Sequence, residues 1–325
     1  MKPAFSVIFL TTLIGAGQGL FLALFTHQSY AFFGQLPMQT DSFYGLGSLL
    51  ALILLAGGLM ASFFHLGHPE RAWRSATQWR TSWLSREVIA LPLFMGLVFC
   101  FGATHLLGWK PVLVTLPSGL FVDLSVGLGA LGTLVAFVLF ICTAMIYACL
   151  RFLREWHSPL TVINYILLGG ASGFTLAAAY AAVMAPSQSN FFAGWAIIIT
   201  LLGFIARSAS LIRNARFQPT STLQTAIGIK HPQIAQRSIG ALGGTFNTRE
   251  FFHGKSDTFL RNIRPGFLIL VFVVPVIILF LSLSTSSALP MGTAFILQYV
   301  GLLAERWYFF AEARHPQNLY YQGKS

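Results

Sequence analysis

The sequence predicts an all-α integral membrane protein, a bundle of eight transmembrane helices with both termini in the cytoplasm. Three observations predict this fold. Only 9% of the 325 residues are charged and the mean hydropathy is +0.71, whereas about a quarter of the residues in an ordinary soluble domain are charged. Several apolar runs are long enough to cross a bilayer. The basic residues collect on one side of the predicted bundle.

The apolar runs give the expected helices in order. A span needs about 20 apolar residues, and eight runs qualify: about 5–27, 44–66, 87–108, 121–149, 160–185, 190–208, 266–286 and 289–312. Backbone groups in lipid must find hydrogen bonds within their own segment, so we expect these runs to be helices. No strand pattern competes with them.

The distribution of lysine and arginine predicts the orientation. With these spans, 19 of the 20 basic residues fall on one side and only Lys110 falls on the other. Cytoplasmic loops carry the excess of basic residues, so this side should be cytoplasmic. The same pattern explains the net charge of +11 without a nucleic-acid partner.

Residues 1–325 are expected to form a single membrane domain with one long polar insertion, at about 209–264 between the sixth and seventh helices. A long loop of this kind in a compact protein is usually functional or disordered. Its aromatic and apolar content favours a cytoplasmic platform for a partner. The alternative is a basic loop lying on anionic lipid.

Three features of the helix packing are predicted from the sequence of the spans. The sequence GAGQG, residues 15–19, pairs small residues at the spacing that lets two membrane helices approach closely. Gln18 lies in mid-membrane and is expected to make a structural hydrogen bond. Pro275 is expected to distort the seventh helix.

The stretch 64–90, FHLGHPERAWRSATQWRTSWLSREVIA, gathers polar residues at one membrane boundary. His65 ends the second run and Glu87 begins the third, and helices joined by a short connection usually pack side by side. An ionisable group inside a span is costly, so Glu87 is a candidate functional residue. The alternatives are a salt bridge from Glu87 to Arg71 or Arg86, and a packed interfacial role for His65.

A quinone fits this boundary, because it enters from the bilayer and needs a polar head site and an apolar tail site. Its reduction takes two protons, and a histidine and a carboxyl group are common proton carriers. We therefore predict Glu87 and His65 as catalytic. Arg71, Arg74, Trp73 and Ser85 complete the predicted quinone site, although interfacial tryptophans are also ordinary membrane-belt residues.

No metal site is predicted in this chain. The three cysteines lie in apolar runs without a CxxC pair, too few for an iron–sulfur cluster. His27 and His105 fall near the opposite surface, where a haem between them is considered the less favoured alternative.

The motif HLGHPERA…S…LSREVIA resembles the HLGxPxRA…LSxEI segment of the membrane-anchor subunits of dimethyl sulfoxide reductase-type molybdoenzyme complexes. The matching residues are His65, Leu66, Gly67, Pro69, Arg71, Ala72, Ser75, Leu84, Ser85, Glu87 and Ala90. The long segment after the sixth helix, the HPQNLYYQ tail and the opening residues look more like the longer anchors of the cytoplasmic sulfite dehydrogenase (Soe-type) branch.

The resemblance implies a haem-free anchor in a bacterial inner membrane, working with two partners. One is a ferredoxin-like subunit with iron–sulfur clusters, and the other carries a molybdenum bis-pterin cofactor. The anchor would bind ubiquinone or menaquinone, and the family's functional histidine and glutamate correspond to His65 and Glu87. No molybdenum chemistry would occur in this chain.

The predicted orientation favours the sulfite branch, because the motif of the reductase relatives faces the periplasm. The function expected is therefore the quinone-reactive subunit of a sulfite dehydrogenase complex. The alternative is a quinol-oxidising anchor of a dimethyl sulfoxide or related reductase. A secondary transporter is disfavoured, because internal repeats and paired midplane charges are not visible. A haem-bearing anchor of the cytochrome b type is the remaining alternative.

Overall fold

The computed structural model describes residues 4–64, 66–117, 119–218, 222–234 and 256–313. Within them, eight helices are long and apolar enough to cross a membrane, which confirms the predicted number. They are α1 (Phe5–Phe32), α2 (Asp41–Phe63), α3 (Trp83–Leu106), α4 (Leu124–Ala148), α5 (Pro159–Met184), α6 (Ser189–Ala215), a composite seventh span and α10 (Ala288–Glu312). The composite span joins α8 (Asp257–Leu268), the π-helix η3 (Ile269–Val273) and α9 (Val274–Ser282).

Local capping explains where several spans begin. The side chains of Thr40, Ser82, Asp123 and Ser158 each accept a hydrogen bond from a backbone N–H in the first turn of α2, α3, α4 and α5. Short polar side chains satisfy first-turn donors that have no partner within the helix. These four helices therefore begin directly after a short polar residue that can cap them.

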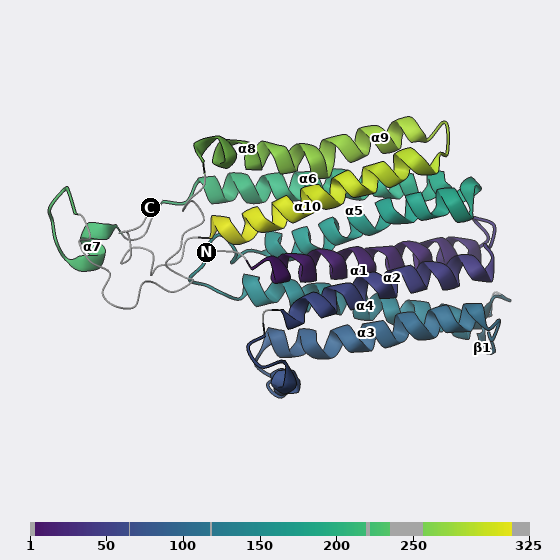
Figure 1. Ribbon diagram of the computed structural model, residues 1–325. Helices are drawn as coiled ribbons and strands as arrows, with labels where there is room; N and C mark the ends of the chain where they lie inside the picture. Colours follow the sequence, from purple (N-terminus) through teal and green to yellow (C-terminus); the bar gives the residue numbers. More distant parts are fainter. Residues whose placement is uncertain (1–3, 65, 118, 219–221, 235–255, 314–325) are drawn as a thin grey trace.

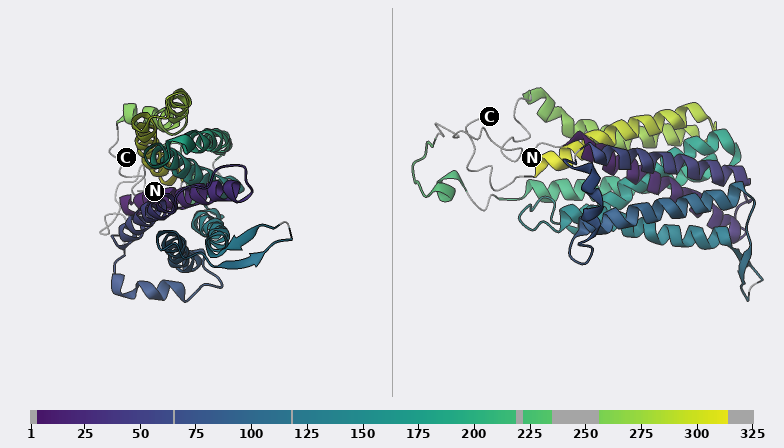
Figure 2. Two further views of the ribbon diagram at one scale, coloured as in Figure 1. Left: turned by 90° about the vertical axis from the view of Figure 1, so that its right-hand side faces the viewer. Right: turned by 60° about the horizontal axis from the view of Figure 1, so that its bottom comes forward.

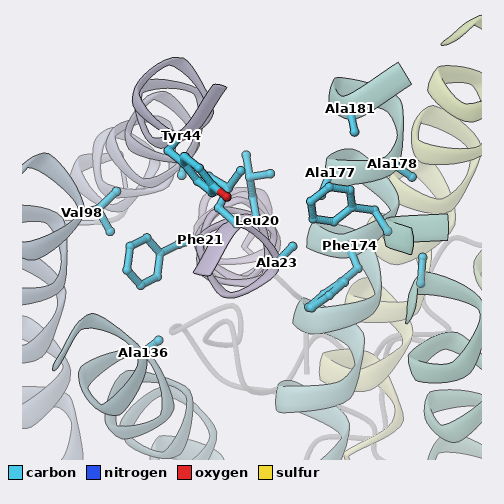
Figure 3. Packing of buried hydrophobic residues seen from close by; sticks show 14 of the residues in the cluster. Leu20, Phe21, Ala23, Tyr44, Val98, Ala136, Phe174, Ala177, Ala178 and Ala181 are labelled. Atoms are coloured by element: carbon cyan, nitrogen blue, oxygen red, sulfur yellow. The ribbon is translucent and has the colours of Figure 1, made fainter. Parts of the chain in front are cut away.

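Helix α1 runs through the middle of the bundle and contacts α2, α4, α5 and α10. Phe21 points towards Val98 of α3 and Ala136 of α4, while Phe174 and Ala177 of α5 lie on the other side of α1 (Figure 3). A Cβ atom at Gly19 would collide with the backbone oxygen of Gly169 on α5. The GAGQG segment thus permits the close helix contact that the sequence predicts.

Helices α3 and α4 form a pair at one edge of the bundle, and α5, α6, α9 and α10 lie on the other side of α1 (Figures 1 and 2). Because the pair stands at the edge, the surface where α3 meets α4 faces outward. The predicted hydrogen bond of Gln18 is confirmed, since its Nε2 donates to the backbone oxygen of Ala136 on α4 at 2.9 Å.

The two ends of the bundle differ. The basic end is the one at which α1 begins, α3 begins and α10 ends, and it carries Arg71, Arg74, Arg80, Arg151, Arg154 and Arg216. The opposite end, here the hairpin end, carries strands β1 (Val112–Thr115) and β2 (Phe121–Asp123), which pair antiparallel. This hairpin corrects the expectation that the fourth span begins at residue 121 and that no strand is present.

The polar insertion is shorter than predicted. Helix α6 continues to Ala215 and α8 begins at Asp257, so both ends of the predicted 209–264 segment are helical. A short helix, α7 (Leu223–Ile227), lies within it. Residues 235–255 lie outside the described residues, so the proposed platform stays a prediction.

The expected distortion at Pro275 takes the form of η3. Proline at the start of α9 lacks the N–H that would bond one turn back. The chain widens into a π-helical turn directly before it, a common response to a break in the hydrogen-bond ladder.

Candidate functional site

Glu87 lies on the second turn of α3, near the basic end, and only 7% of its surface is exposed. Its carboxylate oxygen Oε1 accepts a hydrogen bond from Thr143 Oγ1 of α4 at 2.5 Å. The partner is a neutral hydroxyl group. An acid buried in this way, inside a span, is expensive to keep, so Glu87 stays the candidate functional residue.

The sequence analysis considered a salt bridge from Glu87 to Arg71 or to Arg86, and neither forms among the described residues. The Arg86 guanidinium instead donates to the backbone oxygens of Trp79 and Arg80, at 2.9 and 2.8 Å, and lies over the Trp83 ring. Arg71 pairs with Glu70 at 3.7 Å, and both side chains are exposed. Glu87 consequently has no cationic partner in the described part of the chain.

The rest of the predicted site is not gathered at Glu87. Arg71, Trp73 and Arg74 lie on a short 3-10 helix, η1 (Pro69–Ala76), which has no buried residue and crosses outside the bundle (Figure 2). Ser85 is buried on α3, but a residue two positions before Glu87 points about 200° away around the helix. His65 lies outside the described residues, so its role stays a prediction.

An apolar groove of about 460 Å³ opens between α3 and α4. Its α3 wall includes Arg86, the sequence neighbour of Glu87, and its α4 wall includes Cys142, next to Thr143, whereas Glu87 and Thr143 themselves do not line it. Trp79, Trp83, Ile89, Leu93, Leu134, Val135, Val138 and Ile141 complete the lining. Leu93 and Leu134 are more than half exposed, so the groove faces the lipid.

A second, internal space lies between α1, α4, α5 and α10. It has a volume of about 20 Å³, and Thr143 lines it. The other polar side chains in its wall are Thr11, Thr12, Gln18, Tyr165, Ser172 and Arg306. Thr143 therefore contacts Glu87 and also lines an internal polar cavity.

The comparisons with known proteins agree with this architecture. The family model described as DMSO reductase anchor subunit (DmsC) matches residues 1–311. The chain belongs to this family. The C subunit of the sulfite dehydrogenase of Allochromatium vinosum is 59% identical over 323 residues, which cover 99% of each chain. The resemblance inferred from the motif is confirmed.

Membership of the DMSO reductase anchor family makes this chain the membrane anchor subunit of a multi-subunit oxidoreductase. Among the described residues, no group of three or more histidine, cysteine, aspartate or glutamate side chains is placed to hold a metal ion.

A buried ion-pair cluster near the basic end was missed by the sequence analysis. Arg207 of α6 was assigned to the loop side of the membrane, yet it is 2% exposed inside the bundle. Its Nε lies 2.8 Å from Glu305 Oε1 of α10, and Arg306 Nη2 lies 3.4 Å from Glu305 Oε2. The signal available in the sequence was the occurrence of Glu305 and Arg306 within an apolar run.

The two histidines near the hairpin end are held by hydrogen bonds. Both ring nitrogens of His27 are engaged, with Tyr44 Oη at 2.9 Å and Gln188 Oε1 at 3.1 Å. His105 Nδ1 lies 2.9 Å from Asp41 Oδ1, and its ring stacks on Tyr44. These contacts give both histidines a structural role, and the haem-free state of the anchor stays a prediction.

Proposed function

We propose that this anchor binds a quinone between α3 and α4 and passes it electrons taken from sulfite by its partner subunits. The observation that carries the proposal is Glu87, a buried acid without a cationic partner among the described residues, beside an apolar groove that faces lipid. The extensive similarity to the C subunit of a sulfite dehydrogenase supports sulfite as the source of electrons.

The groove has the chemistry that a quinone requires. Its volume falls within the range of about 300–1,000 Å³ that is usual for small-molecule sites. Aliphatic side chains of both helices suit an isoprenoid tail, and Trp79, Trp83 and Arg86 line the groove at the basic end. A quinone supplies a two-electron acceptor whose carbonyl oxygens must each gain a proton.

The residues of this chain have separate tasks in the proposed reaction. Glu87 donates a proton to a carbonyl oxygen of the ring, and Thr143 fixes the carboxyl group by its 2.5 Å hydrogen bond. Arg86 is held by two backbone oxygens, so it contributes a fixed positive charge at the mouth of the groove. His65 remains our candidate for a second proton donor.

We also propose that the basic end faces the cytoplasm of a bacterium, so that both chain termini are cytoplasmic. The positive-inside distribution supports this orientation. The partners would be a ferredoxin-like iron–sulfur subunit and a molybdenum catalytic subunit, docked on the basic end. The iron–sulfur cluster nearest to the membrane would then lie close to Glu87, which is on the second turn of α3.

The second candidate is the reverse electron flow, in which the anchor oxidises a quinol for an S-oxide or related reductase. The family description, DMSO reductase anchor subunit, favours this alternative. The same groove and the same acid would serve, with Glu87 accepting the proton. Only the substrate of the catalytic partner separates the two functions.

The test is sulfite-dependent quinone reduction by membranes that contain the whole complex, with Glu87→Gln compared with the wild type. We expect the variant to assemble and to lose turnover, because an amide cannot deliver the proton. Glu70→Gln, on the exposed η1 helix, is the matched control and should behave as wild type. Full turnover in Glu87→Gln would refute the site, and quinol-dependent S-oxide reduction without sulfite activity would select the alternative.

A further inference from the structure

The internal cavity beside Thr143 has the size and the polarity of a water site. A buried water needs about 10–15 Å³ and two to four polar partners, and this cavity of about 20 Å³ is lined by seven polar side chains. One of them, Tyr165, is 5% exposed, and its hydroxyl group lies beside Arg306 and Tyr147. Buried polar spaces of this size usually hold an ordered water.

Hydroxyl groups in the wall can accept a hydrogen bond from such a water. The hydroxyl groups of Thr11, Thr12 and Ser172 donate to backbone oxygens of their own helices, so their oxygens can still accept. Thr143 donates to Glu87 and can accept in the same way. A water in the cavity can therefore donate to Thr143.

The cavity is also connected to the basic end by ionisable groups. Arg306 lines it and lies 4.0 Å from the ring centroid of Tyr165. Glu305 joins Arg306 to Arg207 through the ion pairs at 3.4 and 2.8 Å. Glu312, at the end of α10 and only partly buried, interacts electrostatically with Arg207. Ionisable side chains thus extend from the helix end to the cavity.

We propose that this cavity holds a water and that Thr143 relays protons from it to Glu87. The inference rests on the proposed function, in which Glu87 loses its proton to the quinone. The Thr143 hydroxyl then gives its proton to Glu87 Oε1 and takes one from the water. A proton that enters from the basic end restores the water, so no net charge accumulates.

The balance over one turnover is two electrons and two protons. The electrons come from the partner subunits. Each carbonyl oxygen of the quinone gains one proton, and the route through Thr143 and Glu87 supplies one of these two protons. The guanidinium of Arg306 beside the cavity stabilises the negative charge that develops on the water as its proton leaves. Thr143 thus passes protons from the water in the cavity to Glu87 and does not bind the quinone.

Thr143→Val in the whole complex tests the relay, because valine keeps the shape and removes the hydroxyl group. We expect kcat to fall by about a hundredfold, KM for the quinone to stay unchanged, and the solvent isotope effect on kcat to rise. Thr143→Ser should restore most of the rate. Thr133→Val is the matched control on the same helix, since Thr133 Oγ1 is buried without a partner in the described residues.

Infrared spectroscopy supplies a measurement that does not depend on turnover. The C=O stretching band of the Glu87 carboxyl group can be assigned by its loss in Glu87→Gln. In Thr143→Val we expect this band to shift, and the carboxyl proton to exchange more slowly with D₂O. Unchanged exchange, or equal losses in Thr143→Val and Thr143→Ser with a raised KM, would overturn the relay. If Glu87→Gln itself retains turnover, the proposed quinone site fails instead.

Discussion

The hydroxyl group of Thr143 on α4 lies 2.5 Å from the carboxylate oxygen of Glu87 on α3. This contact joins the two helices at the edge of the bundle, beside the internal cavity that Thr143 lines. The partner of Glu87 is a hydroxyl group and not a cation. Glu305 is instead held by two arginines, so the two buried glutamates have different surroundings.

Filling the groove should weaken quinone binding without disturbing the bundle. Val138→Trp places a large ring in the α4 wall, at a position that is 44% exposed to lipid. We expect KM for the quinone to rise about tenfold, which corresponds to about 1.4 kcal/mol, with assembly preserved. Steady-state kinetics with Ile205→Trp, on the exposed face of α6, provide the control. An unchanged KM in Val138→Trp would place the quinone elsewhere.

Removing the charge of Glu305 should destabilise the fold far more than removing that of Glu87. Glu305→Gln leaves Arg207 and Arg306 buried without their anionic partner. Breaking a buried ion pair from one side costs about 3–5 kcal/mol. We expect a lower melting temperature and a smaller assembled fraction of the complex.

The same thermal measurement on Glu70→Gln is the control for Glu305, because that acid is exposed and its pairing is worth at most about 1 kcal/mol. Equal melting temperatures for Glu305→Gln and the wild type would show that the buried cluster does not stabilise the bundle.

The orientation can be tested by labelling from outside the cell. Leu113 is 53% exposed in the hairpin, and Arg80 follows η1 at the basic end. A membrane-impermeant maleimide should label Leu113→Cys in intact cells and Arg80→Cys only after the membrane is opened. The unaltered chain, with its own three cysteines, gives the background. The reverse pattern of labelling would place the basic end outside the cytoplasm.

The sequence alone was sufficient for the number of spans and for recognising Glu87 as a candidate. The free energy of placing a segment in lipid depends mainly on its composition, so eight apolar runs predicted eight helices. Polar residues such as Ser82 and Asp123 mark helix starts for a similarly local reason. Glu87 was recognisable because a charge within an apolar run is costly wherever the helix packs.

Short or outward-facing elements were less predictable. The hairpin pairs segments too short to show a periodic pattern. Arg71, Trp73 and Arg74 are near Glu87 in sequence, but η1 turns them to the outside. Proximity along the chain therefore overestimated how many side chains share the site.

Only the tertiary structure decided what Glu87 contacts. A threonine in an apolar helix is ordinary in sequence, and Thr143 meets Glu87 and the cavity because α4 turns it towards both. Arg207 is part of a buried cluster because α6 turns it towards Glu305 of α10. Composition determines which segments enter the membrane, whereas the rotation and pairing of the helices determine which polar side chains meet inside it.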